Sequence, residues 1–309
     1  MMLRIRLVEE KIAEIYPRQE MRCPVHLSIG QEAVAAGTAA ALSKGDFAMS
    51  GHRSHAHYLA KGGDLKAMLA ELMGREGGCC RGRGGSMHLI DRKVGFLGAV
   101  PIVGSTIPIA VGLAWADRLQ GRQRVTVAFF GEAATEEGVF HESANFASLH
   151  RLPVVFLCEN NLYSVYSPMS VRQPGHREVF QVASAHGIQA AQADGNDPDA
   201  VWSAVSAARH HAGTGLGPVF LEFKTYRWRE HCGPGFDNHI GYREEMEFEA
   251  WKKKDPLETY RHKLATGGIL DSQEIEKLST QISRELEDGL AFARQSPVPT
   301  GMTDFVYAS

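Results

Sequence analysis

The sequence predicts an α/β protein in which a parallel sheet carries helices on both faces. Two apolar runs of strand length lie near residues 125–130 and 153–159. The segment between them, 136–150, has apolar residues at near-helical spacing. Strand and helix alternate in the same way further along the chain. This alternation favours parallel pairing, because parallel neighbours need a long crossover connection that is usually a helix.

The remaining elements follow from the same two periodicities, 3.6 residues for helices and 2 for strands. Helices are expected near residues 2–16, 31–42, 64–73, 104–119, 136–150, 177–186, 197–211, 243–252, 256–265 and 272–294, and further strands near 46–50, 188–193 and 218–224. The first helix has an apolar stripe that must pack on something. Segments without periodicity, rich in glycine or proline, are expected to be mobile loops, namely 74–85, 213–217 and 229–241.

Length and composition favour one domain over 1–309, with an N-terminal helical extension and C-terminal helices. The chain has 309 residues, 44% of them hydrophobic, which is enough for one substantial core. Its net charge of −3 argues against nucleic-acid or anionic membrane partners, and no apolar run approaches membrane-spanning length. The five cysteines are odd in number and lack paired zinc spacing, which is typical of reduced thiols and predicts a cytoplasmic location. Cys158 is expected in a strand core.

Polar residues follow the two predicted central strands where each strand ends. Gly131, Glu132 and Ala133 come after the first strand, and Asn161 and Tyr163 come after the second. The carboxyl ends of parallel strands joined by one helix lie side by side, so Glu132 and Asn161 are expected to meet. A carboxylate, an amide oxygen and a backbone carbonyl are hard ligands that suit Mg²⁺ with positions open for substrate phosphates.

This pattern resembles the signature of thiamin-diphosphate enzymes, a Gly-Asp-Gly-like triplet some thirty residues before an Asn-Asn pair. Glu132 stands in place of Asp and Ala133 in place of the second Gly. Other segments follow the order found in α subunits of 2-oxo acid dehydrogenase E1 components, including pyruvate and acetoin dehydrogenases: 30–33 (GQEA), 51–55 (GHRSH), 84–88 (GGSMH), 101–104 (PIVG), 225–227 (TYR) and the tail 303–307. The resemblance implies the thiamin-diphosphate-binding fold, with thiamin diphosphate and Mg²⁺ as cofactors.

The resemblance also implies roles for particular residues. The metal ligands would be Glu132, Asn161 and the carbonyl of Tyr163. Cofactor contacts would come from His52, Arg53, Ile102, Val103, Ala133, Ala134 and His231. Arg53 suits a bidentate phosphate contact, and His52 replaces the family's usual Tyr. Val103 matches an apolar residue beneath the bent cofactor, although ordinary core packing is an equal alternative.

Two histidines are the catalytic candidates, because histidine is a natural proton donor near neutral pH. His231 matches a family residue at the cofactor diphosphate or the reaction intermediate, and His26 matches one on the substrate side. Four other histidines are expected to be structural: His55, His57, His88 and His141.

A second chain is also implied by the resemblance. In the family, the carboxylate that protonates the cofactor's pyrimidine ring belongs to a pyrimidine-binding domain on a separate β subunit, and this chain has no length left for it. We therefore expect an α₂β₂ assembly whose contacts use the N-terminal helix and the helix 104–119.

Three interpretations of the function remain open. The first is decarboxylation of a 2-oxo acid, or cleavage of acetoin, with acyl transfer to a lipoyl-bearing E2 partner. The second is a carboligase or transketolase-like subunit without that partner. The third is a non-catalytic paralogue, suggested by Ala133 and His52.

Overall fold

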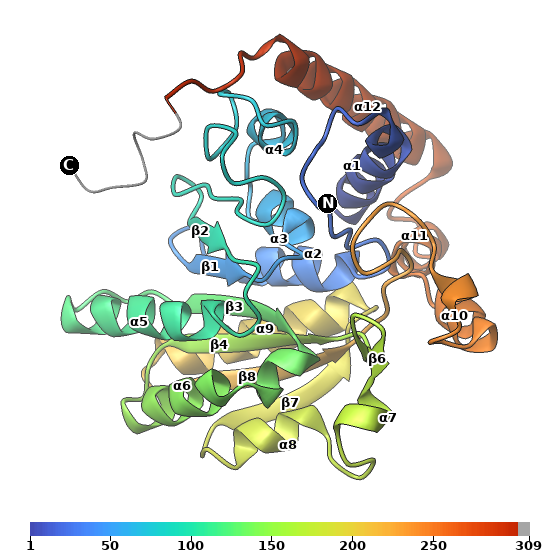
Figure 1. The fold of residues 1–309 in the computed structure, drawn as a ribbon. Helices are drawn as coiled ribbons and strands as arrows, with labels where there is room; N and C mark the ends of the chain where they lie inside the picture. Colours follow the sequence, from blue (N-terminus) through green and yellow to red (C-terminus); the bar gives the residue numbers. More distant parts are fainter. Residues whose placement is uncertain (302–309) are drawn as a thin grey trace.

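A six-stranded parallel sheet forms the centre of the computed structural model, which describes residues 1–301 (Figure 1). The strands are β1 (Phe47–Ser50), β2 (Phe96–Ala99), β3 (Thr126–Gly131), β4 (Val154–Asn160), β7 (Gln189–Asp194) and β8 (Val219–Lys224), in the order β2-β1-β3-β4-β8-β7. The predicted fold class is confirmed. The tail 303–307 lies outside the described residues.

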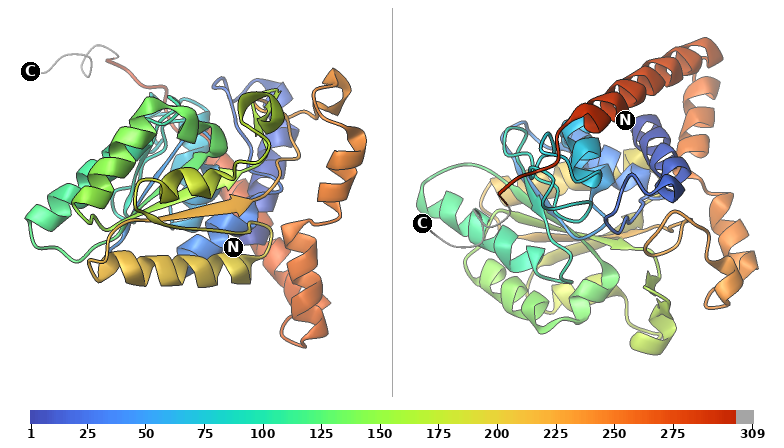
Figure 2. Two further views of the ribbon diagram at one scale, coloured as in Figure 1. Left: turned by 90° about the horizontal axis from the view of Figure 1, so that it is seen from below. Right: turned by 45° about the horizontal axis from the view of Figure 1, so that its top comes forward.

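Helices cover both faces of this sheet (Figure 2). One face carries α5 (Thr106–Leu119), α6 (Gly138–Leu149) and α8 (Val179–Ser184), and the other carries α2 (Glu32–Ala41) and α9 (Pro198–Gly213). Side chains of β3 alternate between the two cores: Val127 and Phe129 pack with α2 and α9, whereas Ala128 and Phe130 pack with α5 and α6. A strand buried on both faces reads as a continuous apolar run, which explains the pattern seen in the sequence.

A further layer of helices lies beyond α2. It comprises α1 (Met2–Ile15), α3 (His55–Ala60), α4 (Leu65–Leu72) and α12 (Ser272–Gln295), with α10 (Glu245–Lys252) and α11 (Pro256–Thr266) at its edge. Ile5, Val8 and Ile12 of α1 are fully buried, and α12 packs on this helix. The chain itself thus covers much of the apolar stripe of α1, through α12, α2 and α3, and the use of this helix in subunit contacts stays a prediction. Nothing local to α1 could have shown this.

Most predicted elements occur within three residues of their expected ends, but several short ones were missed. The missed elements are β2, α3, α7 (Met169–Arg172), the antiparallel pair β5 (Tyr163–Ser164) and β6 (Ser167–Pro168), and the 3₁₀ turns η1 (Tyr16–Arg18), η2 (Glu132–Glu136) and η3 (Asn238–Ile240). β2 follows Gly95 and contains Gly98, both at positive φ, so it lacks the usual strand composition. The expected helix 136–150 begins only at Gly138, after η2.

The segment 229–241 is anchored rather than loose. Asp237 is buried and accepts hydrogen bonds from Arg227 (3.2 Å), Arg243 (2.6 Å) and the hydroxyl of Tyr242 (2.7 Å). The backbone N–H of Gly233 donates to the carbonyl of Val25. These contacts do not support the expectation of a mobile loop over this segment.

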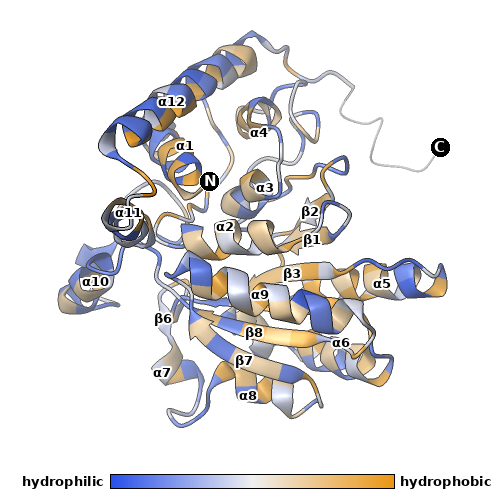
Figure 3. Ribbon diagram, turned by 180° about the vertical axis from the view of Figure 1, so that it is seen from behind, coloured by the Kyte–Doolittle hydropathy of each residue, from blue (hydrophilic) through white to orange (hydrophobic). Residues whose placement is uncertain are grey.

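Hydropathy follows the layers. Figure 3 shows apolar residues concentrated on the strands and polar residues along the outer side of α12. Within residues 1–301, no helix is both long and apolar enough to cross a bilayer.

The contact between α2 and α9 depends on Gly37, and this gives a test of the packing. A Cβ at Gly37 would lie 2.8 Å from the carbonyl oxygen of Pro198 and from Val201 Cβ, whereas one at Gly112 of α5 would meet nothing within 4 Å. We expect Gly37→Val to lower the free energy of unfolding by about 1–3 kcal/mol. Gly112→Val, also in mid-helix, is the control and should change it far less. Urea denaturation of the purified chain measures both, and equal effects would contradict the packing described.

Candidate active site

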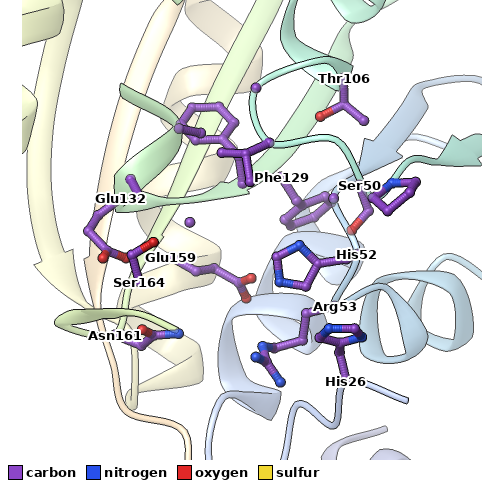
Figure 4. Close-up of a pocket in the computed structure, with 18 of the residues that line it drawn as sticks. His26, Ser50, His52, Arg53, Thr106, Phe129, Glu132, Glu159, Asn161 and Ser164 are labelled. Carbon is purple, nitrogen blue, oxygen red and sulfur yellow. The ribbon is translucent and has the colours of Figure 1, made fainter. Parts of the chain in front are cut away.

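The predicted site residues surround one cavity of about 220 Å³ at the carboxyl ends of β1, β3 and β4. All of them line it: His26, His52, Arg53, Ile102, Val103, Glu132, Ala133, Ala134, Asn161, Tyr163 and His231. Figure 4 shows Glu132, Ser164 and Asn161 on one side and His26, His52 and Arg53 on the other, with Glu159 between them. Segments far apart in the sequence therefore converge here.

The Glu132 side of the cavity is built by the pairing of β3 with β4. Gly131 is in register with Glu159, which brings the residues after both strands together. Glu132 is only 1% exposed, and its Oε1 accepts a hydrogen bond from Arg172 Nη2 at 2.5 Å. Burial raises the pKa of the Glu132 carboxyl, and the charge of Arg172 opposes that rise. Asn161 Oδ1 accepts from the backbone N–H of Tyr163 at 3.3 Å.

These groups fit a hard cation. A positive group, the guanidinium of Arg172, already lies against the buried carboxylate of Glu132. Glu132, Asn161 and Tyr163 all line the cavity. Carboxylate, amide and backbone carbonyl oxygens are the donors that Mg²⁺ prefers.

The opposite side of the cavity carries a buried positive charge. Arg53 donates to the carbonyl oxygens of Leu27 (2.5 Å) and His231 (3.2 Å), and within residues 1–301 no carboxylate is hydrogen-bonded to it. Burial and the nearby charge of Arg227 lower the pKa of Arg53 to about 10. A guanidinium without a carboxylate partner in a cavity is a favourable site for an anion.

Three imidazoles adjoin Arg53. The rings of His26, His52 and His231 have centroids 4.6 to 5.3 Å apart. Burial, and then the charge of Arg53, lower their pKa values to about 2, 4 and 3 respectively, so all three are neutral near pH 7. Nδ1 of His26 is buried without a hydrogen-bond partner. His52, in place of the family's Tyr, is an integral member of this cluster.

Sequence reasoning missed a hydrogen-bonded chain along the cavity wall. Ser50 Oγ lies 2.8 Å from His57 Nδ1, and His57 Nε2 lies 3.2 Å from Glu159 Oε1. All three residues line the cavity, which places His57, expected to be structural, in its wall. The alternation of β4 was the available signal, because it places Glu159 on the side of Asn161 and turns Asn160 to Glu222 (2.6 Å).

The other histidines expected to be structural lie away from the cavity lining. His55 is buried against Ser86 Oγ (2.7 Å), His88 Nδ1 lies 2.7 Å from the carbonyl oxygen of Gly84, and His141 pairs with His186.

Two apolar residues at the cavity are open to solvent. Ile102 is 69% exposed and Val103 is 46% exposed. The alternative that Val103 is ordinary core packing is therefore wrong within this chain.

Comparison with known proteins assigns the family. The model of the family described as "Dehydrogenase E1 component" matches residues 1–301. The chain belongs to this dehydrogenase E1 family. It is 36% identical over 299 residues to the pyruvate dehydrogenase E1 component subunit alpha of Rhizobium meliloti, covering 96% of this chain and 85% of that protein. It is 34% identical over 298 residues to the protein of the same name from Rickettsia felis, covering 96% and 90%.

This E1 chain has a second cluster of ligand-type side chains outside the cavity. Glu71, Cys79 and Cys80 place their ligand atoms within 4.8 Å of one another. The Glu71 carboxylate is already occupied, because it accepts four backbone N–H bonds of 2.7 to 3.0 Å, from Cys80, Gly82, Gly84 and Gly85. We regard Glu71 as a structural residue that shapes this loop.

Two buried arginines of the E1 chain should respond differently to replacement. Arg227 shares the buried Asp237 with Arg243 and Tyr242, so Arg227→Met should cost about 2 kcal/mol by removing one charge-assisted hydrogen bond from a carboxylate that keeps its other partners. Among residues 1–301, Arg53 is hydrogen-bonded to carbonyl oxygens and to no carboxylate. Arg53→Met should therefore stay within about 1 kcal/mol of wild type yet abolish binding of inorganic pyrophosphate. Urea denaturation and calorimetry measure these effects. A larger stability loss in Arg53→Met than in Arg227→Met would refute the assignment of Arg53 as an anion site.

The neutral histidines should make the fold acid-sensitive. The pKa of His52 is about 4 in the folded chain, against 6.5 ordinarily, so the unfolded chain binds more protons between these values. Stability from this group is complete above pH 6.5 and is lost as the pH falls toward 4. We expect His52→Phe to lose less stability over this window than wild type. His262→Phe, at an exposed position, is the control. The same dependence of unfolding free energy on pH in all three proteins would argue against the effect.

Proposed function

We propose that this chain is the α subunit of a thiamin-diphosphate-dependent 2-oxo acid dehydrogenase that binds its cofactor through Mg²⁺. The observation that carries the proposal is the convergence, in an E1 family member, of hard oxygen ligands and a buried arginine on one cavity; within residues 1–301 this arginine has no hydrogen-bonded carboxylate. The family relationship makes thiamin diphosphate the expected cofactor, and the names of the relatives make pyruvate the first substrate to test.

The residues on the two sides of the cavity would bind different parts of the cofactor. Glu132, Asn161 and the carbonyl of Tyr163 would hold Mg²⁺. Arg53 and the amides around Ala133 and Ala134 would hold phosphate oxygens. Bound thiamin diphosphate would supply the carbanion chemistry needed to decarboxylate a 2-oxo acid.

The histidines can move protons once an anion is present. In the cavity as described they are neutral, because burial and Arg53 oppose their protonation. A bound anion beside Arg53 offsets that charge and raises the pKa of a neighbouring imidazole. His231 and His26 would then donate protons on the diphosphate and substrate sides of the cavity.

An exposed apolar surface supports a β-subunit partner. Ile102 and Val103 at the cavity are exposed, and Ile109 in the first turn of α5 is 43% exposed. Large exposed apolar areas mark interaction sites. A β subunit carrying the pyrimidine-binding domain would cover this side, complete the active site and give an α₂β₂ enzyme.

The acyl acceptor distinguishes the remaining alternatives. We propose transfer to a lipoyl-bearing E2, whereas a carboligase would need no lipoyl partner. A non-catalytic paralogue is disfavoured by the presence of Glu132, Asn161, Arg53 and His231 in one cavity. The five cysteines are free thiols, in keeping with a proposed cytoplasmic location.

Reconstitution tests the proposal. The chain alone should show no turnover, and adding its β subunit should produce Mg²⁺-dependent decarboxylation of a 2-oxo acid and acylation of a lipoyl domain. Acyloin formation without lipoyl acylation would favour the carboligase instead. In the assembled enzyme, Glu132→Ala should weaken thiamin diphosphate binding by roughly a hundredfold, and Glu137→Ala at the exposed neighbour should not. Unchanged cofactor affinity in Glu132→Ala would remove Glu132 from the metal site.

A further inference from the structure

Arg172 makes contacts that none of the proposed roles explains. Its Nη2 bonds Glu132 Oε1 at 2.5 Å, its Nη1 bonds Glu136, and its Nε donates to the carbonyl of Ser167 at 3.2 Å. The next residue, Gln173, donates to Glu136 Oε1 at 2.6 Å. The side chain of Arg172 is 12% exposed and that of Glu132 is 2% exposed. A nearly buried guanidinium therefore bridges two carboxylates of η2.

These contacts fasten together the two segments that carry the candidate metal ligands. One segment is η2, which follows β3 and begins with Glu132. The other leaves β4, carries Asn161 and Tyr163, and ends in α7 at Arg172. Arg172 thus connects the far end of the second segment to the first ligand of the first segment.

The electrostatics make Arg172 a substitute for a metal ion. A carboxylate as deeply buried as Glu132 is costly unless a positive charge lies beside it. Arg172 supplies one positive charge at the carboxylate that the proposed Mg²⁺, with two positive charges, would also use. Both cations cannot stay in contact with this carboxylate without strong mutual repulsion at low local dielectric.

We propose that Arg172 is an internal cation that competes with the divalent metal for Glu132. This inference rests on the proposed function, which assigns Glu132 to the metal. Metal loading is then an exchange of cations in which Arg172 releases Glu132 and keeps Glu136, because separate nitrogens of the guanidinium bond the two residues. The exchange keeps Glu132 charge-balanced at every stage, and it makes the metal bind less tightly than its ligands alone would allow.

The test compares Arg172→Gln with wild type in the full chain, using Mn²⁺ as the probe and electron paramagnetic resonance to measure the free ion. Removing the competitor should tighten Mn²⁺ binding roughly tenfold or more. Without metal, Arg172→Gln should melt at a lower temperature than wild type, because Glu132 loses its counter-charge. Saturating Mn²⁺ and thiamin diphosphate should close that gap. Arg172→Lys, which keeps the charge with fewer donors, should fall between the two.

Arg177→Gln is the matched control, since Arg177 is exposed and lies on the same stretch of chain. It should match wild type in both measurements. Equal or weaker Mn²⁺ affinity in Arg172→Gln, or a melting gap that persists with metal and cofactor, would overturn the competition. Failure of the proposed function would look different: wild type and variant would both fail to bind Mn²⁺, even with thiamin diphosphate present.

Discussion

The parallel pairing of β3 with β4, inside a sheet covered on both faces, is the constraint on which the rest of the structure depends. It fixes where the chain leaves the core after Gly131 and after Asn160, and both exits lie at the same edge. Both faces of these strands are buried, so their side chains are mostly apolar and the polar side chains occur where the strands end. The polar side chains of the site therefore gather at the carboxyl ends of the buried strands.

The two sides of the cavity solve the problem of buried charge differently. Glu132 is balanced within the chain by Arg172, whereas within residues 1–301 the hydrogen bonds of Arg53 go to carbonyl oxygens and none goes to a carboxylate. Burying Arg53 without a carboxylate partner therefore costs the fold stability, whereas the pairing of Glu132 with Arg172 avoids that cost. Uncompensated charge of this kind is characteristic of binding sites, because a ligand can supply the missing partner.

Periodicity identified the long helices and the main strands, and position at a strand end singled out Glu132 and Asn161. The other residues proposed for the site came from the resemblance to a known family. Sequence patterns failed where the determining contact is distant in sequence. The burial of α1 depends on α12, and the role of Arg172 depends on a fold-back from β4 to η2 that no local signal encodes. Short elements such as β2 were not predicted, because the glycines in and before β2 weaken the composition that is typical of a strand. The spacing after β3 was misjudged because η2 precedes α6.

Glu71 shows how much of a surface one side chain can determine. Its two oxygens receive four backbone N–H groups from residues 80–85, and only an ionised carboxylate offers two acceptors without a hydrogen of its own. The corresponding amide would turn an NH₂ group toward N–H donors. The conformation of residues 80–85 therefore depends on Glu71 of α4 rather than on the sequence of the turn itself. Met87, two residues beyond Gly85, is part of the cavity wall. Through Glu71, α4 thus helps to shape the cavity although none of its residues is in the cavity lining.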